Sequence, residues 1–227
     1  MSLLEEALEA HGGLDAWRSA REVTVRLRSG GLALKTKLAA GPFREYRARI
    51  SVHEPRAVLT PYPAPGRRGV FEARRVWIES DEGDLIAERR DPRAALSGPR
   101  RKLWWDRLDA LHFAGYALWN YFTTPFLLTR EGVVLREQGR TLHVTFPPGL
   151  PTHSREQAFH FDERGLLRQL DYTAEVFGGW AKANHVCHEH REFGGLVFPT
   201  RRRVTPAGRR HPTLVSIDVD GAEVSRG

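Results

Sequence analysis

LWWDRLDALHFAGYALWNYFTTPFLL, residues 103–128, is the one long aromatic and helix-compatible stretch of this chain. No formally charged residue occurs between Ala110 and Leu128. The segments on either side of it are short and alternate between apolar and polar residues, as strands do. A helix of this kind among strands is most simply placed in the concave face of a curved sheet. The pattern therefore predicts a central helix near 105–122 that ends before Pro125.

The amino-terminal segment predicts a second, short helix over 2–10. Ser2 and Glu5 stand in the spacing of a capping box, and apolar residues three and four apart follow them. Gly12 and Gly13 end this helix. Asp15 is the expected N-cap of a further short turn anchored by Trp17.

The rest of the chain predicts strands joined by short turns, which favour an antiparallel meander. Gly30-Gly31 indicates a hairpin turn, and the 91–102 connector holds at most one helical turn. We expect one domain over 1–227, of the mainly β (α+β) class: an antiparallel curved sheet or half-barrel of about ten strands around the central helix. Candidate strands are 22–28, 32–38, 43–52, 57–60, 69–71, 75–80, 84–89, 131–138, 141–147, 156–162, 166–176, 183–193, 196–205 and 213–220.

Charge and cysteine content limit the classes of function. The net charge is +7, but 31 of the 35 basic residues are arginines dispersed along the chain, which favours a solvated surface over a specific nucleic-acid site. The lone Cys187 excludes an intramolecular disulfide. The first residues, MSLLEEALEAHGG, lack a secretory signal, so we expect a cytoplasmic protein. The uncharged central run contains His112, Asn120 and Pro125, and we do not expect it to span a membrane.

Two regions of the sequence carry a family resemblance. HGGLDAWR (11–18), together with HREFGGLVFPTRRRV (190–204) and TLVSIDVDGAEV (213–224), resembles the LolA/LolB-like superfamily of lipoprotein-carrier-type half-barrels. The middle of the chain, 91–155, is similar to an uncharacterised actinobacterial-type branch. The resemblance implies an antiparallel half-barrel that wraps around helices and encloses an apolar cavity able to hold acyl chains. It does not imply lipoprotein transport here, because an export signal and a lipoprotein cysteine are lacking, and it assigns no functional residue by position.

The aromatic face of the central helix is the first candidate site. His112 and Asn120 are polar residues among these aromatic side chains, and buried polar groups need hydrogen-bond partners, which a ligand can supply. The alternative is a fully packed core without a cavity. The loop THSREQ (152–157) adds two groups suited to a ligand carboxylate. The candidate ligand-binding residues are Trp105, His112, Tyr116, Trp119, Asn120, His153 and Arg155.

The densest reactive cluster is ANHVCHEHREF, residues 183–193. Strand alternation puts His188 and His190 on one face and His185, Cys187 and Glu189 on the other. Either set contains metal-ligand types, but each needs a further ligand from another strand. We therefore expect no metal and no cofactor; if a metal is present, His188 and His190 are its predicted ligands.

Three hypotheses for the function follow. The first is a binding module that holds an apolar or amphipathic, lipid-like small molecule between the sheet and the central helix. The second is an enzyme, a hydrolase or a metal-dependent one, that uses the 185–190 histidines. The third is a basic module for anionic lipid or nucleic acid, where the dispersed charge predicts only weak and salt-sensitive association.

Overall fold

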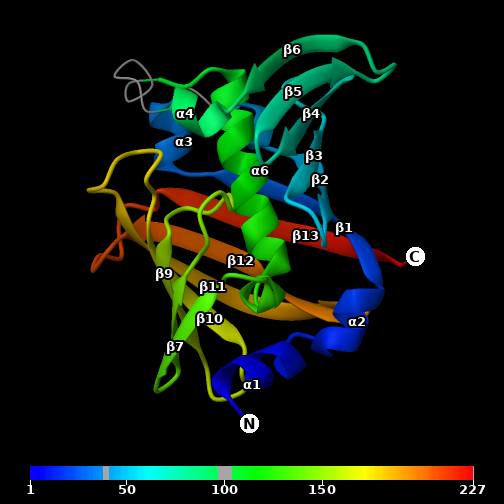
Figure 1. The fold of residues 1–227 in the computed structure, drawn as a ribbon. Helices are drawn as coiled ribbons and strands as arrows, with labels where there is room; N and C mark the ends of the chain where they lie inside the picture. Colours follow the sequence, from blue (N-terminus) through cyan, green and yellow to red (C-terminus); the bar gives the residue numbers. More distant parts are fainter. Residues whose placement is uncertain (38–40, 97–103, 227) are drawn as a thin grey trace.

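The computed structural model describes residues 1–37, 41–96 and 104–226. Thirteen antiparallel strands form one curved sheet, and a long helix, α6, lies in its concave face (Figure 1). The strand order is β6-β5-β4-β3-β2-β1-β13-β12-β11-β10-β9-β8-β7, and the sheet is open because β6 and β7 stand at its two ends. The predicted mainly β class and antiparallel curved sheet are confirmed, with thirteen strands rather than about ten.

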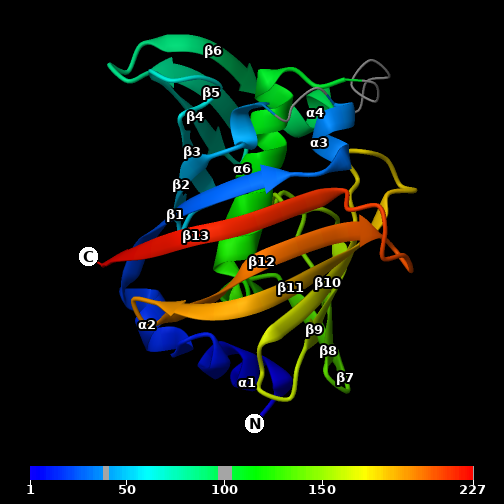
Figure 2. The same ribbon diagram turned by 180° about the vertical axis from the view of Figure 1, so that it is seen from behind.

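The chain follows a simple path through this sheet. It runs outward from β1 to β6, crosses the concave face through α6, begins again at the opposite edge with β7 and returns to β13, which pairs with β1. Seen from behind, β1, β13 and β12 cross the helix (Figure 2). The strands of the first half are β1 (Ala20–Gly30), β2 (Tyr46–Ser51), β3 (Arg56–Thr60), β4 (Arg67–Glu72), β5 (Arg75–Ser80) and β6 (Leu85–Arg90). Those of the second half are β7 (Val134–Gln138), β8 (Thr141–Thr145), β9 (Glu156–Phe161), β10 (Leu167–Thr173), β11 (Lys182–Phe193), β12 (Leu196–Pro206) and β13 (Val215–Arg226). The helices are α1 (Leu3–Ala10), α2 (Gly13–Ser19), α3 (Leu32–Thr36), α4 (Pro92–Ala95) and α6 (Arg107–Thr123), with 3-10 turns η1 (Gly41–Phe43) and η2 (Phe126–Thr129).

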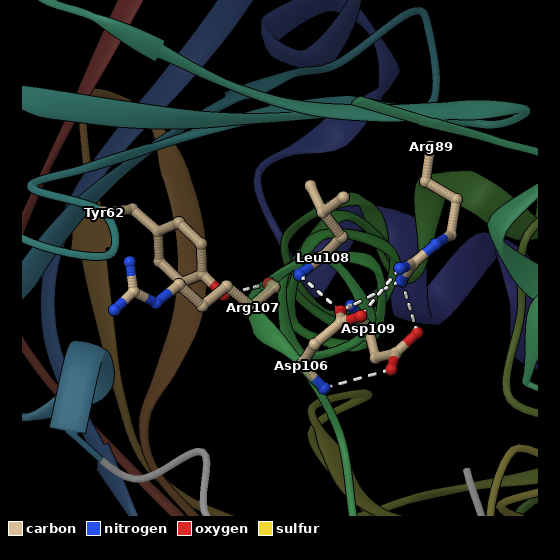
Figure 3. A network of polar contacts seen from close by, with 6 residues as sticks. All are labelled: Tyr62, Arg89, Asp106, Arg107, Leu108 and Asp109. Atoms are coloured by element: carbon tan, nitrogen blue, oxygen red, sulfur yellow. Dashed lines mark hydrogen bonds and ion pairs between the residues drawn. The ribbon is translucent and has the colours of Figure 1, made fainter. Parts of the chain in front are cut away.

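The amino end of α6 is held by a polar network (Figure 3). Asp106 is the N-cap, and its carboxylate accepts from two backbone N–H groups of the first turn, while the Asp109 carboxylate accepts from the N–H of Asp106 at 3.1 Å. Arg89 of β6 bridges both carboxylates, at 2.6 Å from Asp109 and 2.7 Å from Asp106. Tyr62 donates to the carbonyl of Arg107. The network fixes where the helix starts and ties it to the first half of the sheet.

Helix α6 is buried around almost its whole circumference, because the sheet curves around it. Between Leu108 and Thr123 only Ala114 is not buried. The helix approaches β4 very closely at Gly115, where an added Cβ would lie 2.3 Å from the Cβ of Phe71. The uncharged run in the sequence is therefore the interior of the fold, and the predicted central helix is confirmed.

One predicted strand is wrong. The sequence predicts a strand over 32–38, but Leu32–Thr36 form helix α3, and Leu38 lies outside the described residues. Strand β1 pairs with β2 on one side and with β13 on the other, so it has no free edge for a hairpin partner. Alanine, leucine and lysine also favour a helix, and alternation over so few residues does not separate the two periods.

Other boundaries differ in smaller ways. Helix α1 begins with the predicted capping box of Ser2 and Glu5. Helix α2 begins earlier than expected, with Gly12 rather than Asp15 at its N-cap. The 43–52 strand starts only at residue 46, after the 3-10 turn η1. The 91–102 connector was predicted to hold at most one helical turn, and its described part contains the single turn α4. Residues 97–102 lie outside the described ones.

The segments that carry the family resemblance lie against each other. The carbonyl of His11 accepts from the N–H of Val197 at 3.0 Å. Gly12, with φ of 113°, sits so close to Gly195 that an added Cβ would lie 2.1 Å from its carbonyl oxygen. Glycine is required there both by the backbone angle and by the contact. These sequence motifs therefore encode the packing of the amino-terminal helices on the end of β12.

Candidate ligand-binding cavity

A cavity of about 430 Å³ lies beside α6, where five segments distant in the sequence meet. Its walls are α3, Phe113 of α6, the loop at His153, the connection from β10 to β11, and the facing ends of β12 and β13. In Figure 1 these segments lie on the same side of α6. The volume falls within the range of about 300–1,000 Å³ that is common for small-molecule sites.

The lining of this cavity is mainly apolar. Phe113 and Phe177 contribute aromatic rings, and Val204, Leu214 and Val215 contribute branched side chains. Three other hollows, each of about 700 Å³, carry mixed charges instead. They lie on the outer face of β7–β11, beside the amino end of α6, and beside β1. An apolar ligand therefore finds its best match in the smaller cavity, despite the larger volume elsewhere.

Tyrosines and one histidine form a buried hydrogen-bond network in the cavity wall. The two ring nitrogens of His153 face two tyrosines of α6: Nδ1 lies 3.3 Å from the Tyr116 hydroxyl, and Nε2 lies 2.7 Å from the Tyr121 hydroxyl. Tyr121 in turn lies 3.3 Å from the hydroxyl of Tyr172, whose ring stacks on His153 at 4.1 Å. The hydroxyls and the imidazole nitrogens are thus paired with one another. The carbon atoms of the rings are left to form the surface of the cavity.

Burial keeps this network uncharged. It lowers the pKa of His153 to about 3 and raises the pKa values of Tyr116, Tyr121 and Tyr172 well above the usual value. At neutral pH the imidazole therefore has one donor and one acceptor nitrogen. Whichever nitrogen carries the proton, one tyrosine of α6 donates to His153 and the other accepts from it. The wall suits an apolar chain or a neutral polar group better than a charged one.

Asn120 positions the loop that carries His153. Its side-chain amide donates to the carbonyls of Tyr116 and Pro151, both at 2.7 Å. The predicted need of this buried amide for partners is met within the protein. His112 differs, because both of its ring nitrogens are buried between the rings of Phe71 and Tyr116 and have no hydrogen-bond partner among the described residues. Burial lowers its pKa to about 3.

Trp105 precedes α6 and lies beside the cavity. Its ring packs at 4.7 Å from that of Phe177, which lines the cavity, and at 5.1 Å from that of Phe113. The ammonium of Lys37 lies 5.7 Å from the Trp105 ring centre. Trp105 therefore supports the cavity wall from behind.

The remaining predicted ligand residues lie elsewhere. Trp119 is fully buried under the guanidinium of Arg130, 5.4 Å from its ring centre, and does not line the cavity. Arg155 is exposed, whereas His153 two residues before it is fully buried. The structure thus brings His112, Tyr116, Asn120 and His153 together with Trp105 nearby, and separates Trp119 and Arg155 from them.

The histidine cluster of β11 divides between solvent and interior. His185 and Cys187 point inward and are buried, while His188 and Glu189 are exposed. Strand alternation breaks at Glu189, whose φ is 57°, and His190 then lies 6.0 Å from the ring of His11 rather than beside His188. Among the described residues, no group of three or more His, Cys, Asp and Glu side chains is placed to hold a metal ion.

A hydroxyl–imidazole–carboxylate chain lies on the outer face of the sheet. Thr141 is 2.9 Å from Nδ1 of His160, and Nε2 of His160 is 2.8 Å from Asp171. Gln169 and Asn184 donate to the other oxygen of Asp171. These residues are partly exposed neighbours on adjacent strands, so cross-strand pairing accounts for the arrangement without a catalytic role.

The fold is shared with solved structures of known families. A LolA superfamily protein from Nitrosomonas europaea superposes with a TM-score of 0.52 at 10% identity, over 99% of this chain and 93% of that one. A DUF1329 family protein from Desulfovibrio piger gives a TM-score of 0.52 at 12% identity, over 99% and 92%. No protein-family model and no curated protein sequence matches the chain. The chain therefore has a LolA-like fold, while its similarity to an actinobacterial branch stays a prediction.

Membrane insertion through a helix has no support in the described residues. None of the helices that they form combines the length and the apolar character needed to cross a bilayer.

Several residues of the cavity were not predicted from the sequence. Lys37, Phe177 and Trp180 all line it, and Trp180 is 82% exposed at its rim. The connection 174–181 looks like simple turn material in the sequence, and α3 looks like a strand. A tryptophan directly after two glycines, Gly178 and Gly179, was a local signal of an apolar rim on a turn.

Proposed function

We propose that this protein binds an apolar or amphipathic, lipid-like small molecule in the cavity between α3, α6 and the sheet. The observation that carries this proposal is a mainly apolar cavity of about 430 Å³, beside which the buried His153–tyrosine network is uncharged and paired within itself. An apolar chain in this space loses contact with water and strands no buried donor or acceptor.

The rim of the cavity supports the same proposal. Leu32 of α3 and Trp180 of the β10–β11 connection both line it, and they are 44% and 82% exposed. Large exposed apolar side chains beside an apolar cavity are typical of a ligand-binding surface. A bound chain covers them and gains further buried area.

The interior offers room to extend the site. A small void of about 30 Å³ lies between α6 and β1–β13, and it shares Phe113 and Val215 with the cavity. We propose that a rotation of the Phe113 ring connects this void with the cavity. Long and short chains are then both accommodated along the sheet-facing side of α6.

The LolA-like fold agrees with this proposal without naming the ligand. The superfamily resemblance implies an acyl-chain cavity in this position between sheet and helix, and the solved structure from Nitrosomonas europaea shares the fold alone. The role of lipoprotein carrier does not follow from it.

Two measurements test the proposal. Native mass spectrometry of the purified protein detects a co-purified lipid, and titration with Nile red, an uncharged fluorophore, detects a free apolar site. Ala174→Trp fills the cavity at its rim and should abolish the Nile red signal. Ala158→Trp places the same side chain in the hollow on the outer face of β9 and should leave the signal unchanged. Equal Nile red binding by wild type and Ala174→Trp, without a co-purified ligand, would contradict a site in this cavity.

A further inference from the structure

Three of the segments that line the cavity also form its rim: α3, the β10–β11 connection and the β12–β13 turn over 207–214. Hydrogen bonds hold the turn between the other two segments. The N–H of Leu32 donates to the carbonyl of Thr213 at 3.1 Å, and the N–H of Ala207 donates to the carbonyl of Lys182, directly after the connection, at 3.0 Å. The three segments extend from the same side of the molecule in both views (Figure 1, Figure 2).

Two large apolar side chains of this rim face solvent. Leu32 is partly exposed, and Trp180 is 82% exposed. The indole of Trp180 lies over the bare backbone of Gly178, where an added Cβ would be 2.7 Å from its Nε1. Its N–H makes no hydrogen bond with the described part of the protein. A tryptophan with an exposed ring and a free N–H is typical of side chains at a membrane–water interface.

The unpaired charge on the same rim is positive. Lys35 of α3 and Arg209 and Arg210 of the turn are exposed, and none of them forms an ion pair with any residue that the structure describes. The acid of these segments, Glu175, is paired with Arg93 at 2.6 Å. Lys35 is distant in the sequence from the two arginines, so only the fold brings these cations to one rim.

We propose that this rim surface, formed by Leu32, Lys35, Trp180, Arg209 and Arg210, binds an anionic lipid bilayer. Each basic side chain close to an anionic bilayer strengthens binding by about fivefold. The indole enters the headgroup region, where its ring leaves water and its N–H finds an acceptor. The inference goes beyond the proposed function, because it names a partner that binds whether or not the cavity holds a ligand. It also turns the opening of the cavity towards a source of lipid-like molecules.

A bilayer suits this surface better than a nucleic acid does. Sites for single-stranded nucleic acid carry several aromatic rings on which successive bases stack. The second exposed apolar side chain here, Leu32, has no ring to offer, whereas its aliphatic carbons gain from leaving water in a bilayer.

Cosedimentation with vesicles tests the proposal on the wild-type protein. Vesicles of phosphatidylcholine alone are compared with vesicles of phosphatidylcholine and phosphatidylglycerol. We expect at least about tenfold tighter binding to the vesicles that contain phosphatidylglycerol, and this preference should shrink as the salt concentration rises. Weak and equal binding to both kinds of vesicle would overturn the proposal.

A pair of double variants locates the charge that binds the bilayer. Arg209→Glu, Arg210→Glu should lower the affinity for anionic vesicles by about thirtyfold or more and leave Nile red binding unchanged. The control is Arg47→Glu, Arg49→Glu on β2, which changes the net charge equally at exposed positions that do not line the cavity, and it should lower the affinity only a few-fold. Equal losses in both variants would show that net charge alone attracts the protein and would overturn the rim surface.

A second pair of variants tests the apolar part of the surface. Trp180→Ala should weaken binding to anionic vesicles several-fold. Val134→Ala, at a position on β7 that is 64% exposed and does not line the cavity, should leave it unchanged. Unaltered vesicle binding in Trp180→Ala would contradict insertion of the indole.

The outcomes for the rim surface and for the cavity can be told apart. Nile red binding without vesicle binding would overturn the rim surface and leave the cavity site intact, and vesicle binding without Nile red binding would do the reverse. Binding of single-stranded or duplex DNA in place of vesicles, lost in Arg209→Glu, Arg210→Glu, would overturn the bilayer in favour of a nucleic acid.

Discussion

The guanidinium of Arg202 on β12 donates to the main-chain carbonyl of Tyr121 at 2.8 Å and closes the carboxyl end of α6. The usual donor to that carbonyl, four residues on, is Pro125, which has no N–H. Arg202 is 1% exposed and forms no ion pair with a carboxylate within the described part of the chain; its second hydrogen bond goes to the sulfur of Cys187, at 3.3 Å. A positive charge at a helix carboxyl end is also favourable. This buried cation therefore ties the helix to the sheet.

Arg202→Ala should lower the free energy of unfolding by roughly 3–8 kcal/mol. It removes a packed side chain, worth about 2–5 kcal/mol, and leaves a buried carbonyl without a donor, worth about 1–3 kcal/mol. Arg202→Met keeps most of the volume and should lose only about 1–3 kcal/mol, the cost of the carbonyl. Urea denaturation measures both values.

The neighbouring Arg201 supplies the control. It points outward, half exposed, and pairs with Glu189 at 2.8 Å. Arg201→Ala should cost less than about 1 kcal/mol, as exposed ion pairs do. A loss from Arg202→Ala no greater than that from Arg201→Ala would show that the Tyr121 carbonyl does not depend on the arginine.

Much of the sheet was predictable because several strands, such as β2, β5 and β8, alternate between buried and less buried residues and short turns separate the strands. The 75–80 and 84–89 candidates, for instance, correspond to β5 and β6 to within one residue. The pattern failed at 32–38, where pairing of β1 on both sides left no edge for another strand. The alternation of apolar and polar residues within a segment does not show whether a neighbouring strand still has an unpaired edge. The strand predicted over 32–38 could therefore not be excluded from the sequence alone.

Arg89→Met should destabilise the protein by about 3–5 kcal/mol. Asp109 is completely buried, and Arg89 forms an ion pair with it at 2.6 Å, so the substitution removes a close cation from a buried carboxylate (Figure 3). The double variant Arg89→Met, Asp109→Asn should recover part of the loss, because the charge is then absent. Thermal and urea unfolding check the pair.

The exposed pair of Arg74 and Asp91 is the matched control for this ion pair. Its atoms lie 3.0 Å apart, but the side chains are 84% and 57% exposed. Arg74→Met should cost less than about 1 kcal/mol. A similar cost for Arg74→Met and Arg89→Met would contradict a structural role for the buried pair.

Acid should destabilise this protein below pH about 6.5. Burial lowers the pKa values of His112 and His153 to about 3 and of His11 and His190 to about 4. The unfolded chain takes up protons near the ordinary histidine pKa of about 6.5, while the folded chain does not, so stability is present above that pH and is lost as pH falls towards the folded values. Each such histidine contributes at most about 1.4 kcal/mol per pH unit.

His112→Phe isolates one part of this acid sensitivity. It replaces a buried ring with two unpartnered nitrogens between Phe71 and Tyr116, so stability at pH 7 should change little or rise. The dependence of the melting temperature on pH between about 6 and 4 should become shallower. His211→Ala, at an exposed position, should leave the dependence as it is. An unchanged slope in His112→Phe would show that this histidine is protonated in the folded protein.

The candidate site was only partly predictable, because its walls come from segments that the fold alone brings together. The aromatic run and the His153 loop indicated one wall, and Asn120 indicated how that loop is held. Lys37 and Phe177 both line the cavity from segments without a motif, and the approach of the Lys37 ammonium to within 5.6 Å of the Phe177 ring centre follows only from the three-dimensional fold. Helical spacing placed Trp119 with Tyr116, although these residues face different neighbours once the sheet surrounds the helix.

Trp119 and Trp180 should separate stability from binding. Trp119 is fully buried and away from the cavity, so Trp119→Ala should cost about 3–5 kcal/mol in unfolding and leave Nile red affinity unchanged wherever the variant stays folded. Trp180 is 82% exposed at the cavity rim, so Trp180→Ala should change stability by less than about 0.5 kcal/mol and weaken binding several-fold, because the ligand loses a ring that covers it. Urea denaturation and Nile red titration of both variants measure the two effects separately. The reverse result, lost affinity in folded Trp119→Ala with unaltered affinity in Trp180→Ala, would move the binding site to the interior face of α6.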